Sequence, residues 1–131
     1  MTTENLWGSL DFEPVTTPKS ILEKQANYLT ERTRGTLQGR VGDQSEGEVF
    51  IFDLDIVAPS LNKYRYTVLT VRHTIELYPI SVFAEAQENR GVLCHNQAEF
   101  ETALSGILQA PRTRRVISAL LSQSGYEPPP F

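Results

Sequence analysis

The spacing between hydrophobic residues changes twice along the chain. Over residues 17–35, apolar side chains recur at the three- and four-residue intervals of an amphipathic helix. Over residues 36–95 the interval falls to two, which is typical of strands whose side chains alternate between two faces. Helical spacing returns over residues 96–125, where Pro111 divides the stretch into two helices. The pattern therefore predicts one helix, then several strands, then two helices.

The predicted helices begin at residues that favour helix starts. Thr17 is a suitable N-cap, and Pro18 fits the first turn because a missing N–H costs nothing there. Asn96 followed by Glu99 is a capping-box-like start for the second helix. Gly35 is a suitable residue to end the first helix.

Four or five strands are predicted between the helices. Four of these strands are bounded by turn-forming residues. They are predicted at residues 36–41, 48–57, 64–74 and 92–95. Residues 75–86 are also apolar but contain no Gly, Asn or Asp, so they form either a bent continuation or a separate strand. Consecutive strands joined by short turns make an antiparallel sheet. We therefore expect an α+β fold: an N-terminal helix, an antiparallel sheet of four to five strands and two C-terminal helices packed on one face.

The two central strands predict which sheet face is buried. With Val57 paired to Tyr64 across the loop at residues 58–62, the face under the helices carries Phe50, Phe52, Leu54, Ile56, Leu69 and Val71. The helices complete the predicted core with Ile21, Leu22, Leu29, Phe100, Leu104, Ile107 and Leu120. The other face then carries Val49, Ile51, Asp53, Asp55, Tyr64, Tyr66, Val68, Thr70 and Arg72. Such a mixture of aromatic, aliphatic and charged residues is typical of a protein-binding surface.

Length, composition and charge limit the class of protein. The chain has 131 residues, 40% hydrophobic and 21% charged, which predicts one globular domain over residues 1–131. Its net charge of -4 argues against a nucleic-acid or anionic-membrane partner. The sequence has no membrane-length apolar run and no signal-peptide pattern, so we expect a cytoplasmic protein. Residues 1–16 are expected to form an extended arm laid on the core, and residues 126–131 a proline-rich tail.

Few residues offer catalytic chemistry. Asp53 and Asp55 lie on the same side of a strand and could hold a divalent metal ion, with His73 as a further group. Cys94 and His95 are neighbours on a strand, so their side chains point to opposite faces and cannot act as nucleophile and base. We find no phosphate-binding loop and expect no catalytic residue, metal or cofactor.

Three arginines lie at the start of the third predicted helix. Arg112, Arg114 and Arg115 oppose the helix dipole there. An anion would meet both their side chains and the free N–H groups of the first turn, which makes the cluster a candidate anion-binding site. The alternative is that nearby acidic side chains neutralise them.

These observations favour a non-catalytic interaction module with an accessory or regulatory role. Its partner would be a second copy, forming a homodimer, or another protein. The predicted protein-binding residues are Asp53, Asp55, Tyr64, Tyr66, Val68 and Arg72. One alternative is a small metal-dependent hydrolase or nuclease-like enzyme that uses Asp53, Asp55 and His73. The other is a small-ligand carrier with an enclosed apolar cavity between sheet and helices.

Overall fold

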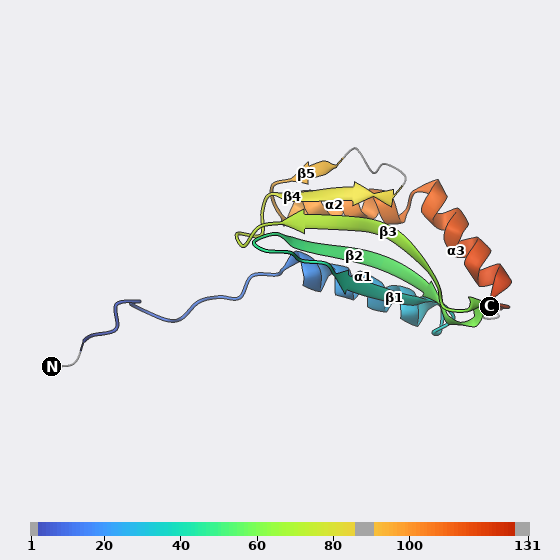
Figure 1. Cartoon of the computed structure of the whole chain (residues 1–131), viewed down its shortest axis with the longest axis horizontal. Coiled ribbons are helices and arrows are strands. Elements are labelled where there is room, and N and C mark those ends of the chain that lie inside the picture. Colours follow the sequence, from blue (N-terminus) through green and yellow to red (C-terminus); the bar gives the residue numbers. More distant parts are fainter. Residues whose placement is uncertain (1–2, 86–90, 128–131) are drawn as a thin grey trace.

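A computed structural model describes residues 3–85 and 91–127 and confirms the α+β fold class (Figure 1). Its elements are α1 (Pro18–Arg32), β1 (Gln38–Asp43), β2 (Phe50–Ala58), a short 3-10 turn (Pro59–Leu61), β3 (Tyr64–His73), β4 (Ile80–Ala84), β5 (Val92–Cys94), α2 (Gln97–Leu108) and α3 (Pro111–Gln123). The five strands form one antiparallel sheet in the order β1-β2-β3-β4-β5. Residues 128–131 of the predicted tail, and most of the predicted turn at 88–91, lie outside the described residues.

The helices pack on one face of the sheet, on different halves of it (Figure 1). α1 packs on β1 and β2, whereas α2 packs on β3, β4 and β5. α3 follows α2 directly and lies across the end of the sheet near the β2–β3 turn (Figure 1). Within the described part of the chain, the opposite sheet face carries no helix.

Both predicted helix caps are confirmed. The Ser20 N–H donates to Thr17 Oγ1 over 3.1 Å, and the Glu99 N–H donates to Asn96 Oδ1 over 2.9 Å. The Glu99 side chain reaches back one residue beyond the cap, where its Oε1 accepts from the His95 N–H, so the start of α2 resembles a capping box. These caps satisfy N–H groups that have no partner within the helix.

The core lies between the helices and the inner sheet face. Of the thirteen residues predicted on the inner sheet face and the inward sides of the helices, ten are buried, and Leu29, Phe50 and Ile107 are partly buried against the same cluster. Phe100, Leu22, Leu69 and Val71 are fully enclosed. The predicted face of β2 is therefore confirmed.

The backbone of β1 approaches α1 very closely at Gly39. A Cβ atom placed there would lie 2.3 Å from the Ala26 carbonyl oxygen, well inside contact distance. The Gly39 N–H also donates to Thr30 Oγ1 on α1, over 3.0 Å. Glycine at this position thus lets α1 lie against the β1 edge of the sheet, which leaves the other half of the sheet to α2.

A β-bulge in β3 overturns the predicted placement of three side chains: Tyr64, Tyr66 and Val68. Ala58, not Val57, pairs with Tyr64, and the register shifts again between Leu54 and Asp55 of β2. Val68 is the extra residue at that shift. Strict alternation therefore fails, and Tyr66 and Val68 join the buried core instead of the outer face.

Residues 75–86 contain a separate strand, β4, rather than a continuation of β3. The chain reverses between β3 and β4 with Leu77 in the left-handed region, at φ +76°. The Leu77 N–H donates to the Thr74 carbonyl across this turn. Leucine rarely adopts this conformation and has no preference for turns. The sequence therefore contained no signal for the reversal at this position.

Candidate functional site

The uncovered sheet face, called here the open sheet face, is polar rather than half apolar. Pairing across the strands places on it Gln38, Arg40, Ile51, Asp53, Asp55, Val57, Arg65, Thr67, Thr70, Arg72, Ser81, Phe83 and Leu93. Of the six predicted protein-binding residues, Asp53, Asp55 and Arg72 lie on it. Tyr66, Val68 and Tyr64 lie on the helix side, where Tyr64 remains half exposed at the end of the sheet. The mixed aromatic surface predicted for this face is therefore not formed.

Asp53 and Asp55 are buried at the centre of the open sheet face, and each is hydrogen-bonded. Thr70 Oγ1 donates to Asp53 Oδ1 over 2.6 Å, and Gln44 Nε2 donates to Asp53 Oδ2. Thr67 Oγ1 donates to Asp55 Oδ1 over 2.8 Å, and Arg65 Nε lies 3.9 Å from Asp55 Oδ2. Each carboxylate oxygen thus faces a protein donor, which favours a structural role for the pair.

Burial raises the pKa of the Asp55 carboxyl, and the negative charge of Asp53 adds to this effect. The hydrogen bond from Thr67 and the charge of Arg65 oppose it but are outweighed. The ionised form of Asp55 is therefore less favourable in the folded protein than in the unfolded chain.

The residues of the hydrolase hypothesis do not converge. His73 is buried on the helix side of the sheet, where its ring stacks on Phe50 with centroids 5.3 Å apart. Asp53 and Asp55 lie on the opposite face of the same sheet. Among the described residues, no three His, Cys, Asp or Glu side chains gather to hold a metal ion.

Cys94 is a buried, free cysteine in β5. Burial raises the pKa of its thiol, and the negative charge of Glu99 acts in the same direction. A raised pKa keeps the thiol protonated near neutral pH, which lowers its nucleophilicity. His95, the adjacent residue, is exposed and turned to Glu99, with Nδ1 3.1 Å from Oε1.

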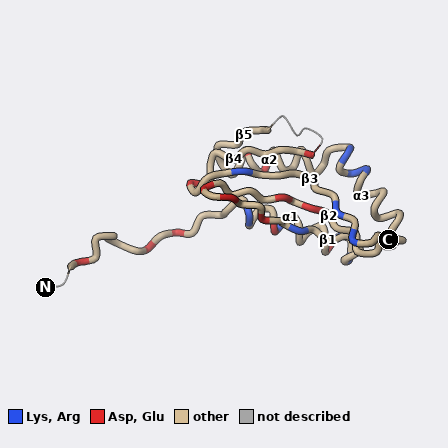
Figure 2. Tube along the Cα trace, in the orientation of Figure 1, with Lys and Arg blue, Asp and Glu red and all other residues tan. Residues whose placement is uncertain are grey.

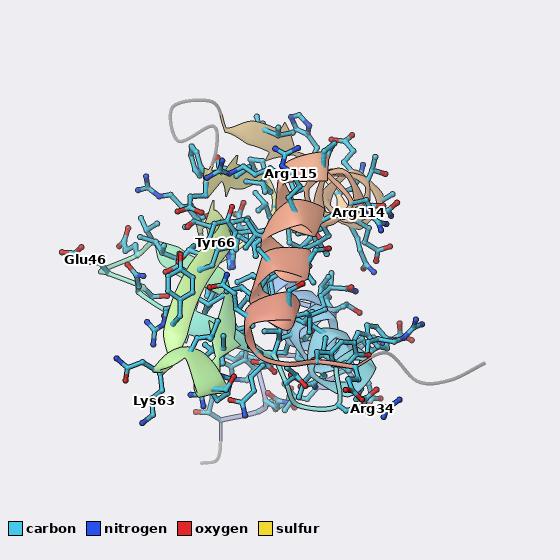
Figure 3. The ribbon with its side chains drawn as sticks, turned by 90° about the vertical axis from the view of Figure 1, so that its right-hand side faces the viewer. Arg34, Glu46, Lys63, Tyr66, Arg114 and Arg115 are labelled. Carbon is cyan, nitrogen blue, oxygen red and sulfur yellow. The ribbon has the colours of Figure 1, made fainter. Side chains whose placement is uncertain are left out.

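The arginine cluster does not gather around one point. Arg112 and Arg115 are three residues apart on one face of α3, whereas Arg114 points in another direction (Figure 3). The Tyr66 hydroxyl beside Arg112 raises the pKa of that guanidinium, with Glu85 contributing. The helix N-cap, Ala110, offers no side-chain acceptor. The anion-binding residues thus remain a prediction without a formed site.

The strongest candidate site is an apolar hollow between the helices, which we call the interhelix groove. α1 forms one wall, and the end of α2 with the start of α3 forms the other. The groove has a volume of about 380 Å³ and an apolar floor and walls formed by Ala26, Leu29, Leu54, Ile56, Val68, Leu108 and Ile117. Its volume lies in the range of pockets that bind ligands in proteins.

A second, more polar hollow of about 790 Å³ extends the groove toward the N-terminal ends of α1 and α2. The two hollows share Gln25, Tyr28 and Leu108, so they form one continuous trough along α1. Thr16 lies in the second hollow, where the N-terminal arm joins α1. Four charged residues also line the trough: Lys24, Arg32, Asp55 and Glu101.

The sequence contained only part of the signal for this groove. Helical spacing identified Leu29 as an inward-facing residue, and Leu29 lines the groove and is only partly buried. The separation of α1 from α2 depends on where each helix lies on the sheet, which periodicity does not specify. Val68, part of the floor, was placed on the wrong face because of the bulge.

The N-terminal arm does not lie on the core, contrary to the expectation from its apolar residues. Its described part, residues 3–16, extends away from the sheet and helices (Figure 1). Five large apolar side chains are exposed along it: Leu6, Trp7, Leu10, Phe12 and Val15. The described part of the arm therefore does not cover the open sheet face either.

The chain matches no model of a known protein family, and it matches neither a curated protein nor a solved structure. In the described ranges, none of the helices has the length and apolar character needed to cross a membrane.

Proposed function

We propose that the protein is a non-catalytic binding module that holds an apolar segment of a protein partner in the interhelix groove. The observation that carries this proposal is the apolar hollow between α1 and the α2–α3 pair, whose walls of Leu29, Leu108 and Ile117 are only partly buried above a buried floor. Apolar surface open to water is unfavourable, and removing it from water on binding would drive association. The proposal includes a cytoplasmic location and an accessory or regulatory role.

The shape of the site favours a chain segment over a small ligand. The groove is an open trough that continues into the second hollow along α1, so its occupant would be elongated. A helix laid in an apolar groove and an extended segment are both established modes of peptide recognition. A small-ligand carrier would instead need an enclosed cavity, as expected above for that alternative.

The open sheet face is the weaker candidate for the same function. Its central carboxylates are engaged with Thr67, Thr70 and Gln44, and binding there would disturb bonds already made. Its apolar residues, such as Ile51, Val57 and Phe83, are separated by polar neighbours on the same face. We therefore place the partner in the groove.

Tyr28 gives a direct test of the groove. It lines both hollows and its side chain is 52% exposed, so Tyr28→Glu adds a charge at the groove without unfolding the core. Asn27→Glu makes the same charge change on the exposed side of the same helix and is the matched control. Tyr28→Glu should weaken binding of anilinonaphthalene sulfonate, a dye that becomes fluorescent on apolar surface, at least several-fold.

The same two variants then serve as baits for proteins in a cell extract, identified by mass spectrometry. Proteins retained by the wild-type chain and by Asn27→Glu, but lost from Tyr28→Glu, would be groove-dependent partners. Equal dye binding and equal protein retention by all three chains would contradict the proposal.

A further inference from the structure

We propose that the interhelix groove is occupied by the N-terminal arm of a second copy of this chain, so that two chains exchange arms. This inference rests on the proposed function, because it assigns an occupant to the same groove. It adds the identity of that occupant and the residues that carry it.

The arm carries the apolar side chains that such a groove would bury. Leu6, Trp7 and Phe12 are 87%, 78% and 72% exposed, and Leu10 and Val15 are exposed beside them. Large aromatic residues are the usual anchors of protein interfaces, because each removes a large apolar area from water. One chain thus has both an exposed apolar segment and an apolar groove whose walls are only partly buried.

The arm is long enough to reach into the trough of a neighbouring molecule. Residues 3–16 span about 46 Å when fully extended. α1, which forms one wall along the whole trough, has 15 residues and is about 22 Å long. The arm is therefore long enough to place Trp7 and Phe12 in the groove of a neighbouring molecule and still bridge the gap between the two.

The joint between arm and helix directs the arm away from its own groove. Pro14 and Pro18 flank the joint, and the residue before a proline is held in an extended conformation. Thr17 is extended, with φ -91° and ψ 154°, and its side chain is bound to the start of α1. Folding back along α1 would require a reversal within this stiff segment. The arm instead points outward, toward a second copy (Figure 1).

Charge supports the same pairing. The described part of the arm carries Glu4, Asp11 and Glu13 and no Lys or Arg (Figure 2). The trough offers Lys24 and Arg32 from α1 against the carboxylate of Glu101. Asp55 also lines the trough, but its carboxylate lies on the open sheet face, where it accepts from Thr67. An acidic, apolar segment is therefore attracted to the α1 side of the trough, where the two cations lie.

Trp7 is the single tryptophan of the chain, so its fluorescence reports directly on the arm. At micromolar dilution the arm is free, and Trp7 should emit as a water-exposed indole that acrylamide quenches efficiently. At concentrations near millimolar, the emission should shift to the blue, quenching should fall several-fold, and light scattering should report a dimer. Tyr28→Glu should abolish all three changes, and Asn27→Glu should leave them intact.

A mixing experiment distinguishes exchange between chains from folding back within one chain. One chain carries Trp7→Ser with Phe12→Ser, so that its groove is intact and its arm is disabled. The other carries Tyr28→Glu, so that its arm is intact and its groove is blocked. Neither should show a shielded tryptophan alone, but their mixture should shift to the blue, because the intact arm enters the intact groove of the other chain.

Two results would overturn the inference. A wild-type chain that remains monomeric with Trp7 shielded at every concentration would show that the arm occupies its own groove. Trp7 exposed at every concentration, together with no recovery on mixing, would show that the arm does not bind the groove at all. In the second case the proposed function stands if Tyr28→Glu still weakens dye binding, and it fails with the inference if dye binding is unchanged.

Discussion

At Gly39 the backbone of β1 lies so close to α1 that no side chain fits between them. Gly39→Ala should therefore force α1 away from the sheet and lower the free energy of unfolding by about 1–3 kcal/mol or more. Gly106→Ala is the control, because no atom lies within 4 Å of its would-be Cβ in α2. That change should stabilise the protein by about 0.5–1 kcal/mol. Urea unfolding measures both, and equal effects would contradict the close packing.

Another single residue, Asp55, makes the stability of the folded protein depend on pH. Its pKa is raised above the ordinary 3.8 by burial, so the folded protein binds this proton more tightly than the unfolded chain does. Its contribution to stability must then fall as pH rises from 3.8 through the raised pKa, and stay constant above it. Asp55→Asn removes the charge and keeps an oxygen that accepts from Thr67.

The stability of Asp55→Asn relative to wild type should therefore increase with pH across that window and then level off. Urea unfolding at a series of pH values measures this difference, in which the contributions of carboxyl groups that do not interact with Asp55 cancel. A difference independent of pH would contradict the assigned shift, and a difference that decreases with pH would reverse its sign.

At the scale of elements, the β3 bulge decides which side chains the helices cover. Val68 is buried and Thr67, its neighbour, lies on the open sheet face beside Asp55. Val68→Lys should lower the free energy of unfolding by at least about 3 kcal/mol, because it buries an unpaired charge. Thr67→Lys places the same charge on the open sheet face, close to the Asp55 carboxylate, and should cost less than about 1 kcal/mol. Strict alternation along β3 would predict the opposite ranking.

The sequence predicted the elements well where local chemistry determines them. Thr17 and Asn96 cap helices through their own side chains, and the face of β2 follows from its alternation. The sequence did not predict features that depend on contacts between residues far apart in the chain. The bulge at Val68 depends on pairing with β2, and the turn at Leu77 uses a residue without turn preference. Separating β4 from β3 therefore required the structure.

At the scale of the molecule, the groove arises from the placement of helices and not from any one element. α1 lies against the β1 edge at Gly39, while α2 covers β3, β4 and β5, and a hollow with partly buried walls is left between the helices. The candidate residues on β2 and β3 were predicted as one surface, but the sheet divides them between its two faces. Tyr28, Leu108 and Ile117 entered the candidate site only when the helices were positioned.

The central claim is that this protein associates through the interhelix groove and not through the open sheet face. Methyl NMR spectra of the wild-type chain, recorded from dilute to concentrated solution, compare the two surfaces directly. We predict that the methyl resonances of Leu29, Leu108 and Ile117 shift with concentration, whereas those of Ile51 and Val57 stay in place. Shifts confined to Ile51 and Val57, with the groove resonances unchanged, would contradict the account.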